Sequence, residues 1–229
     1  MRTTVADRQF DEERALYNLR EADVTNCVFA GPADGESVLK ESRDVNLTDC
    51  TFSLRYPLWH VKKFIMDHST MDELTRAAIW YASDGTIKDS TLGGIKAVRE
   101  CERISLANCR IVSQEFGWKS SEIVLTDSEI ESEYLFFDSR DVKLDGVKMK
   151  GKYSFQYMKN LEITDCVLDT KDAFWHSENV TVRNSVVKGE YLAWFSDGLT
   201  LIDCKIIGTQ PLCYCKNLKL INCTMEDTD

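Results

Sequence analysis

The sequence predicts an all-β protein, a right-handed parallel β-helix (solenoid) of about twelve 19-residue coils, with three short strands per coil. The first observation is a repeat, seen clearly in the segment Leu-Thr-Leu-Ile-Asp-Cys-Lys-Ile and anchored on Leu201. The same pattern is anchored at Val5, Val24, Leu47, Met66, Ile87, Leu106, Leu125, Leu144, Ile163, Val182 and Leu220. Nine of the eleven spacings are 19 residues, and the others are 23 and 21. A fixed period of this length indicates stacked units that bury their apolar sides against each other, so residues 1–229 form a single domain.

The second observation is a column of turn-forming residues two positions after each anchor. Eleven of its twelve members are Asp, Asn or Gly, with His68 as the exception. These residues adopt left-handed backbone angles at the lowest cost, so we predict a sharp bend at this position of every coil. A calcium ladder is the alternative reading, but the glycine-rich loops and extra oxygen ligands that it needs are missing.

The third observation is a pair of core columns beside this bend. The residue five positions after the anchor is apolar in all twelve coils, and the residue three positions after it is mostly small. That small column holds six of the nine cysteines, and cysteine packs well as a small buried hydrophobe. We therefore predict one strand ending near the anchor and another after the bend, with the cysteines as packed thiols.

A third strand is predicted five to ten residues before each anchor, where the residue eight positions before the anchor is mostly apolar. Connections between parallel strands are nearly always right-handed, which favours the right-handed helix. The two longer spacings predict protruding loops at 31–36 and 72–76.

Composition limits the partners that we expect. The net charge of −10, from 38 acidic and 28 basic residues, disfavours nucleic acid because no basic stripe offsets it. The first residues lack the apolar run of a signal peptide, and no apolar stretch is long enough to cross a membrane. We expect a cytoplasmic protein with no membrane or nucleic-acid partner.

One wall of the rod is rich in aromatic residues. All five tryptophans, Trp59, Trp80, Trp118, Trp175 and Trp194, lie seven positions before an anchor. If the residue before each of them points inward, alternation places the tryptophans outside as flat platforms suited to sugar rings. The alternative is that they point inward and fill a wide coil.

Charged side chains in and beside this column complete a candidate binding site. Arg99 and Lys119 are candidate ligand-binding residues together with the five tryptophans. The candidate catalytic acids and bases are Glu100, Asp138, His60 and His176. General acid–base catalysis requires two such groups at one substrate atom, whereas charged residues on an outer wall are usually only solvated.

Cys213-Tyr-Cys215 invites comparison with a zinc site. Its single intervening residue is shorter than the two to four residues typical of structural zinc motifs, and no histidine is near in sequence. We expect no metal and no other cofactor.

Three segments carry a resemblance to a known family: Gly35-Glu-Ser-Val-Leu-Lys-Glu-Ser, Asp172-Ala-Phe-Trp-His-Ser and Thr209-Gln-Pro-Leu-Cys-Tyr-Cys-Lys-Asn-Leu. Through them nearly the whole chain resembles DUF3737, a bacterial family of unknown function. The resemblance implies a pectin-lyase-like right-handed β-helix and brings no catalytic residues. It also implies that family members continue beyond Asp229, leaving the last coil here without its usual cover. Because bare strand edges attract other chains, we expect a homodimer through the C-terminal coil at 218–225.

Two functions remain open at this point. The first is binding of a small carbohydrate or glycosylated metabolite on the aromatic wall, with or without lyase or hydrolase activity. The second is a non-enzymatic scaffold or protein-interaction rod. Whether the tryptophans are exposed to solvent distinguishes these two functions.

Overall fold

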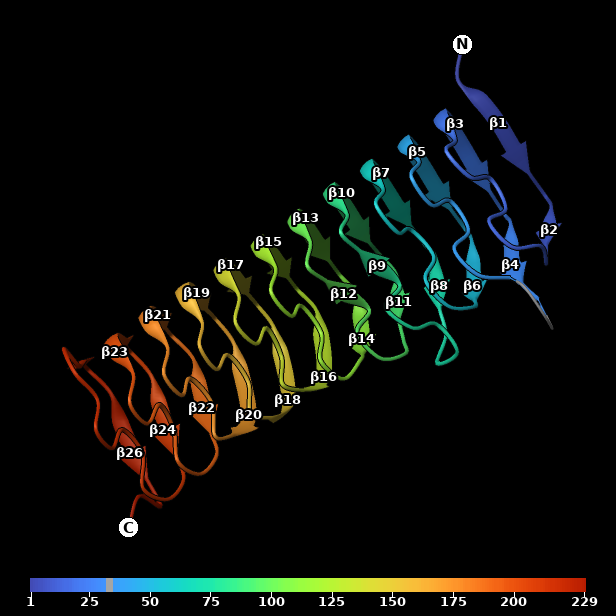
Figure 1. Cartoon of the computed structure of the whole chain (residues 1–229). Helices are drawn as coiled ribbons and strands as arrows, with labels where there is room; N and C mark the ends of the chain where they lie inside the picture. Colours follow the sequence, from blue (N-terminus) through green and yellow to red (C-terminus); the bar gives the residue numbers. More distant parts are fainter. Residues whose placement is uncertain (32–34) are drawn as a thin grey trace.

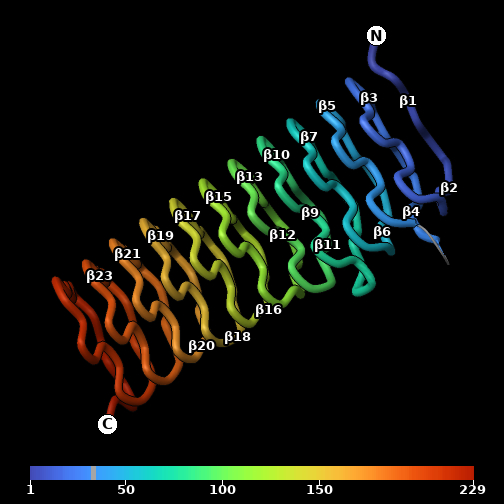
Figure 2. The backbone as a smooth tube through the Cα atoms, viewed as in Figure 1, coloured from blue at the N-terminus to red at the C-terminus, as the bar shows by residue number. Residues whose placement is uncertain are grey.

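The protein is a straight rod in which the chain winds from one end to the other (Figure 1). The computed structural model describes residues 1–31 and 35–229. Successive turns of the backbone have nearly the same outline, so the tube in Figure 2 reads as a stack of similar coils. The predicted all-β solenoid of about twelve 19-residue coils is confirmed. Among the described residues there is no helix long and apolar enough to cross a membrane.

Two parallel sheets of 12 strands each run the length of the rod. Sheet A consists of β1 (Thr3–Ala6), β3 (Arg20–Thr25), β5 (Arg43–Thr48), β7 (Lys62–Asp67), β10 (Ser83–Lys88), β13 (Glu102–Ala107), β15 (Ser121–Thr126), β17 (Arg140–Asp145), β19 (Lys159–Thr164), β21 (Glu178–Arg183), β23 (Asp197–Ile202) and β25 (Lys219–Ile221). Sheet B consists of β2 (Gln9–Phe10), β4 (Val28–Ala30), β6 (Thr51–Ser53), β8 (Thr70–Met71), β11 (Thr91–Leu92), β14 (Arg110–Val112), β16 (Glu129–Glu133), β18 (Lys148–Lys152), β20 (Val167–Lys171), β22 (Val186–Lys188), β24 (Lys205–Ile207) and β26 (Thr224–Glu226). Anchor residues lie opposite one another in sheet A, as Leu106, Leu125 and Leu144 do.

The bend between the two sheets lies at the predicted column. All twelve residues of this column have positive φ, between 46° in Asp127 and 65° in Gly146. Their side chains form hydrogen bonds between coils, and Asn26 Nδ2 donates to Asp7 Oδ1 at 2.7 Å. Each such bond joins two coils at the corner where the backbone leaves one sheet for the other.

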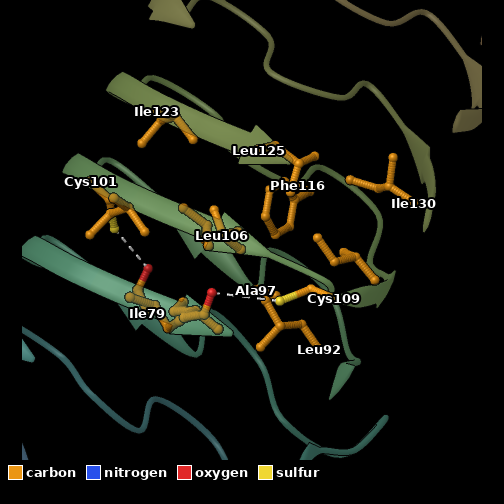
Figure 3. Packing of buried hydrophobic residues seen from close by; sticks show 14 of the residues in the cluster. Ile79, Leu92, Ala97, Cys101, Leu106, Cys109, Phe116, Ile123, Leu125 and Ile130 are labelled. Atoms are coloured by element: carbon orange, nitrogen blue, oxygen red, sulfur yellow. Dashed lines mark hydrogen bonds between the residues drawn. The ribbon is translucent and has the colours of Figure 1, made fainter. Parts of the chain in front are cut away.

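The interior of the rod is a continuous apolar core, part of which is seen in Figure 3. Leu106 and Leu125 in the anchor column and Ile111 in the column after the bend are each 1% exposed or less. Buried thiols satisfy backbone carbonyls inside this core, and Cys101 Sγ donates to the Ile79 oxygen at 3.1 Å. All nine cysteines are free thiols, and five of the six in the small column are buried as predicted, whereas Cys223 in the last coil is half-buried.

The third face differs from the prediction of a third strand in every coil. Among the residues that the structure describes, only β9 (Ile79–Trp80) and β12 (Val98–Arg99) form a sheet there. In the other coils the face is built from turns with left-handed residues at every second position, such as Tyr134, Phe136 and Asp138 with φ of 55°, 51° and 52°. Because every second residue is left-handed, no two consecutive residues of this segment are extended, and a regular strand cannot form.

The turns of the third face still bond to the neighbouring coils. Phe136 N donates to the Phe116 oxygen at 2.7 Å in the preceding coil, whereas Asp138 N donates to the Gln156 oxygen at 3.0 Å in the following coil. The face therefore keeps the coils in register without forming a regular ladder.

Two further features depart from a uniform rod. The predicted loop at 72–76 is a turn that exposes 64% of Leu74, whereas the loop predicted at 31–36 lies partly outside the described residues. In the last coil, Leu220 and Met225 occupy core columns but are 41% and 43% exposed. Their counterparts one coil earlier, Leu201 and Ile206, are 1% exposed or less.

Candidate functional site

The tryptophan column lies on the outside of the third face, while the preceding residue of each coil points into the core. Leu58 and Phe174 in that preceding column are fully buried, and Trp59 and Trp175 beside them are partly exposed. Alternation therefore places the tryptophans outside.

Four of the five tryptophans pack in pairs along the rod axis. The rings of Trp59 and Trp80 are stacked with centroids 5.3 Å apart, and Trp175 and Trp194 are stacked in the same way at 5.6 Å. Lys40 Nζ lies 4.0 Å from the Trp59 ring centroid, and the guanidinium of Arg99 lies 5.3 Å from that of Trp80. The Trp59–Trp80 stack thus has a cation against each end, which leaves it no free ring face for a sugar.

The indole nitrogens of the column differ in their partners. Trp118 Nε1 donates to the Tyr134 oxygen at 2.7 Å, and Trp175 Nε1 donates to the Tyr191 oxygen at 2.7 Å. Among the described residues, the buried Nε1 of Trp59 has no hydrogen-bond partner. Most of this column therefore serves to tie one coil to the next.

The column beside the tryptophans is more exposed. Tyr157, His176, Phe195 and Tyr214 form a continuous stack, here called the aromatic ladder, with centroids 5.1, 5.1 and 4.8 Å apart. Tyr157 is 47% exposed, Phe195 46% and Tyr214 68%. Because the inner rings are covered face to face, a ligand on this ladder meets mainly ring edges and the tyrosine hydroxyl groups.

Three consecutive charged residues directly precede the ladder in the same column: Glu100, Lys119 and Asp138. Glu100 is paired with Arg99, whose Nε lies 3.0 Å from Glu100 Oε1. Partial burial alone would raise the pKa of Glu100, but hydrogen bonds from Tyr81 and Arg99 outweigh burial and the net shift is downward. The same contact with Glu100 raises the pKa of Tyr81. An ionised, paired Glu100 is a poor proton donor near neutral pH.

The structure does not bring the four candidate acids and bases together. His60, Glu100, Asp138 and His176 occupy one column at intervals of two coils. At the usual spacing of strands, successive members are about 10 Å apart. His60 is stacked on Tyr81 at 5.1 Å, and His176 lies inside the aromatic ladder. No two of the four are placed to act on one substrate atom.

A hollow of about 480 Å³, here called the ladder groove, follows the corner between the aromatic ladder and sheet A. Its lining consists of Tyr157, His176, Phe195 and Tyr214 on one wall and Ser177, Glu178, Asp197 and Lys216 on the other. Glu178 is paired with Lys159 at 3.2 Å, and Asp197 Oδ1 accepts a hydrogen bond from Asn217 Nδ2 at 2.7 Å. One wall is thus aromatic and the other carries hydrogen-bonding charges.

A second hollow of about 610 Å³, here called the central groove, lies on the outer surface of sheet A. It crosses the strands β10, β13, β15, β17 and β19, and among its lining residues are Asp84, Ser105, Glu122, Asp141, Lys143 and Glu162. This groove was not predicted from the sequence.

The central groove exists because the strands of sheet A are kinked three residues before each anchor. Asp84, Arg103, Glu122 and Asp141 all have φ between 55° and 58° there. Each kink projects a polar side chain beside the small floor residues Thr86 and Ser105. The sequence pattern that could have predicted the kink is the recurrence of Asp, Asn and Gly in this column, at Asp141, Asn160, Asn179 and Gly198.

Ion pairs tie together several charges of the central groove. Arg103 Nε lies 2.6 Å from Asp84 Oδ1, and Lys143 Nζ lies 3.1 Å from Glu162 Oε2. The hydrogen bond from Arg103 lowers the pKa of Asp84, although partial burial opposes the shift. Asp84 therefore stays ionised.

One group of possible metal ligands lies away from both grooves. Ligand atoms of Asp67, His68 and Asp89 are within 4.8 Å of one another. Asp67 already contacts His68 Nδ1 at 2.7 Å and Lys88 Nζ at 2.9 Å. Because the Lys88 ammonium group supplies the positive charge, this carboxylate needs no added cation.

Comparison with solved structures relates the rod to other β-solenoids. The A-module of the mannuronan C-5 epimerase AlgE4 from Azotobacter vinelandii is 8% identical, with 99% of this chain and 87% of that chain covered and a TM-score of 0.51. PfbA, a surface adhesin of Streptococcus pneumoniae, is 9% identical over 96% of this chain and 71% of that chain, with a TM-score of 0.48. At such identities the likeness concerns the fold alone.

Comparison of the sequence points to one family. No curated protein matches the chain. The family described as "Protein of unknown function (DUF3737)" matches residues 3–229. With the β-solenoid fold and nearly the whole length matched, the chain belongs to the DUF3737 family.

Proposed function

We propose that this protein binds carbohydrate in the ladder groove, with the aromatic ladder as one wall. The observation that carries the proposal is the continuous row of exposed ring edges facing Glu178 and Asp197. Ring edges carry partial positive charge and suit the oxygens of a sugar, and carboxylates accept strong hydrogen bonds from its hydroxyl groups.

The exposed ladder itself favours a ligand. Soluble proteins seldom leave a contiguous apolar surface in water unless it binds something. Tyr157 and Phe195 lie two coils apart on this surface, and the charged wall runs parallel to them. Similarity to an epimerase named for mannuronan adds an example of this fold in a carbohydrate-active protein.

The proposal concerns binding and assigns no reaction. Lyase or hydrolase activity stays a prediction. Glu100, Asp138, His60 and His176 lie too far apart to share a substrate atom, so no reaction is assigned to them. Glu178 and Asp197, on adjacent coils, are the carboxylates that a bound sugar would meet.

A glycan array followed by calorimetry of the best ligand tests this proposal. We expect the double variant Tyr157→Ala, Phe195→Ala to bind at least tenfold more weakly than the wild type. Tyr17→Ala is the matched control, because Tyr17 is 54% exposed but lies shortly before β3, near the N-terminal end of the rod. An array without signal, or an equal loss in Tyr17→Ala, would overturn the proposal.

A non-enzymatic scaffold is the second candidate. Its supporting observation is the covering of ring faces by neighbouring rings, which makes much of the wall structural. On this alternative the ladder variant loses stability but no sugar affinity, which thermal unfolding and calorimetry distinguish.

A further inference from the structure

We infer that the ligand is an extended amino-sugar chain that occupies the central groove as well as the ladder groove. This inference rests on the proposed function and deepens it, because it names the charge and the length of the carbohydrate. It is carried by the adjacency of the two grooves, which both take lining residues from the coil anchored at Ile163, and by their common excess of carboxylates.

The two grooves meet within one coil. Tyr157 lines the ladder groove and Asn160, three residues later in the same coil, lines the central groove. Lys159 lies between them and is paired with Glu178 at 3.2 Å. Asn179 Nδ2 also donates to Asn160 Oδ1 at 2.8 Å, which ties the last coil of the central groove to the coil that carries Glu178.

The combined track is long. The central groove spans the coils anchored from Ile87 to Ile163, and the ladder groove spans those from Ile163 to Leu220. Eight coils at the usual strand spacing extend over about 34 Å. A surface of this length, with similar polar groups once per coil, suits a chain of sugars lying along the rod.

The charges of the track select the class of sugar. In the central groove, Asp84, Glu122, Asp141 and Glu162 outnumber Arg103 and Lys143 by four to two. In the ladder groove, the carboxylates Glu178 and Asp197 outnumber the ammonium group of Lys216 by two to one. A polyuronate would be repelled by this excess, whereas the ammonium groups of glucosamine units would be attracted.

Glu122 and Asp141 are the best placed to meet such ammonium groups. They lie on adjacent coils and are 53% and 42% exposed, and neither has an ion pair shorter than 3.6 Å. The nearest cation to Glu122 is Arg103, 4.0 Å away and already shared with Asp84. Two neighbouring carboxylates without a close ion pair repel each other, and a cation bound between them removes this repulsion.

The experiment measures binding of glucosamine oligomers of two and six units by calorimetry. We expect the hexamer to bind at least tenfold more tightly than the dimer, and its affinity to fall as salt rises. The double variant Glu122→Gln, Asp141→Asn should weaken the hexamer at least fivefold and leave the dimer unchanged. Glu131→Gln is the matched control, since Glu131 is an exposed carboxylate on sheet B.

The outcomes separate this inference from the proposed function. If sugars bind but the hexamer gains nothing over the dimer, or the double variant behaves like the control, the inference fails alone. If an N-acetylated hexamer or an oligogalacturonate bound as tightly as the glucosamine hexamer, the inference that the ligand is positively charged would be overturned. Binding of a decalysine peptide with equal affinity would overturn the assignment to carbohydrate.

Discussion

The ring of Phe64 occupies the space that a side chain at Gly85 would need: a Cβ built on Gly85 would lie 2.3 Å from Cε1 of Phe64. The two residues pair directly in the register of β7 and β10. Gly85 also lines the floor of the central groove, so the packing of the core and the shape of the groove depend on the same contact.

We therefore predict that Gly85→Ala destabilises the protein by about 1–3 kcal/mol, the usual cost of overpacking a core. Chemical denaturation followed by circular dichroism measures the change. In the background of Phe64→Leu, which provides space, the same substitution should cost less. Equal costs in the two backgrounds would contradict the role assigned to Phe64.

A pair of tryptophan substitutions tests the hydrogen bonds of the third face. Trp59→Phe and Trp175→Phe both keep a stacked ring, but only Trp175 loses a hydrogen bond, the one to the Tyr191 oxygen. We expect Trp175→Phe to cost about 1 kcal/mol more in unfolding free energy than Trp59→Phe. A reversed order would show that the indole nitrogens do not tie the coils together.

The cysteines should differ strongly in reactivity. Burial raises the pKa of Cys50 to about 11 and that of Cys101 to about 12, so neither forms thiolate near neutral pH. Of the nine thiols, only the partly exposed Cys213 and Cys223 should react quickly with a thiol reagent at pH 8, since burial also raises the pKa of Cys215. Mass spectrometry of the labelled protein identifies them, and rapid labelling of Cys101 in the folded state would contradict the burial described.

Asp172 should make the protein less stable as pH rises. Burial raises the pKa of Asp172 in the folded state, so its ionisation opposes folding. The penalty is absent below the pKa of the unfolded chain, about 3.9, and grows as pH rises toward and through the folded value. Asp172→Asn should therefore stabilise the protein at pH 7 but not at pH 3.

Urea denaturation at the two pH values checks this prediction. Asn tolerates the left-handed backbone at this position, where φ is 54°, so the substitution adds no backbone strain. A gain of equal size at both pH values would mean that the effect does not come from ionisation.

The homodimer expected from the sequence stays a prediction. The apolar groups of the last coil are flanked by Lys219 on β25 and Glu226 on β26, and a twofold arrangement can place these opposite charges together. Light scattering should give twice the mass of one chain. Leu220→Lys should abolish the dimer, whereas Val167→Lys, at an exposed site in the middle of the rod, should not.

The sheets and the bend between them could be predicted because their residues follow simple physical rules. Core columns such as Leu106, Leu125 and Leu144 need apolar side chains in every coil, and the bend needs residues like Asp127 that tolerate positive φ. Both requirements repeat at the coil period. The repeat in the sequence therefore predicts the core columns and the bend directly.

The third face could not be predicted in the same way. Its left-handed positions hold bulky residues such as Tyr134 and Phe136, which rarely adopt positive φ and read as strand formers from sequence. Bonds between coils and ring stacking, as between Phe136 and Phe155, offset the cost here. These are tertiary interactions, and a local sequence pattern does not reveal them.

The candidate site was predicted in part. The aromatic wall was predicted, but the sequence left open whether its tryptophans point outward or inward. The structure places them outside, and His176 lines the ladder groove. The central groove was missed because Asp84, Arg103 and Glu122 look like ordinary polar corner residues. Only the kink that they share makes them one wall of a groove.

The shared register of the coils has a consequence for how this protein can change in evolution. Neighbouring coils contact each other through equivalent residues, since Leu125 pairs with Leu106 of the preceding coil and with Leu144 of the following coil. Gain or loss of a whole 19-residue unit would lengthen or shorten the molecule and leave both new junctions compatible. Insertion of a single residue into a strand would instead turn every following side chain of that strand to the opposite side.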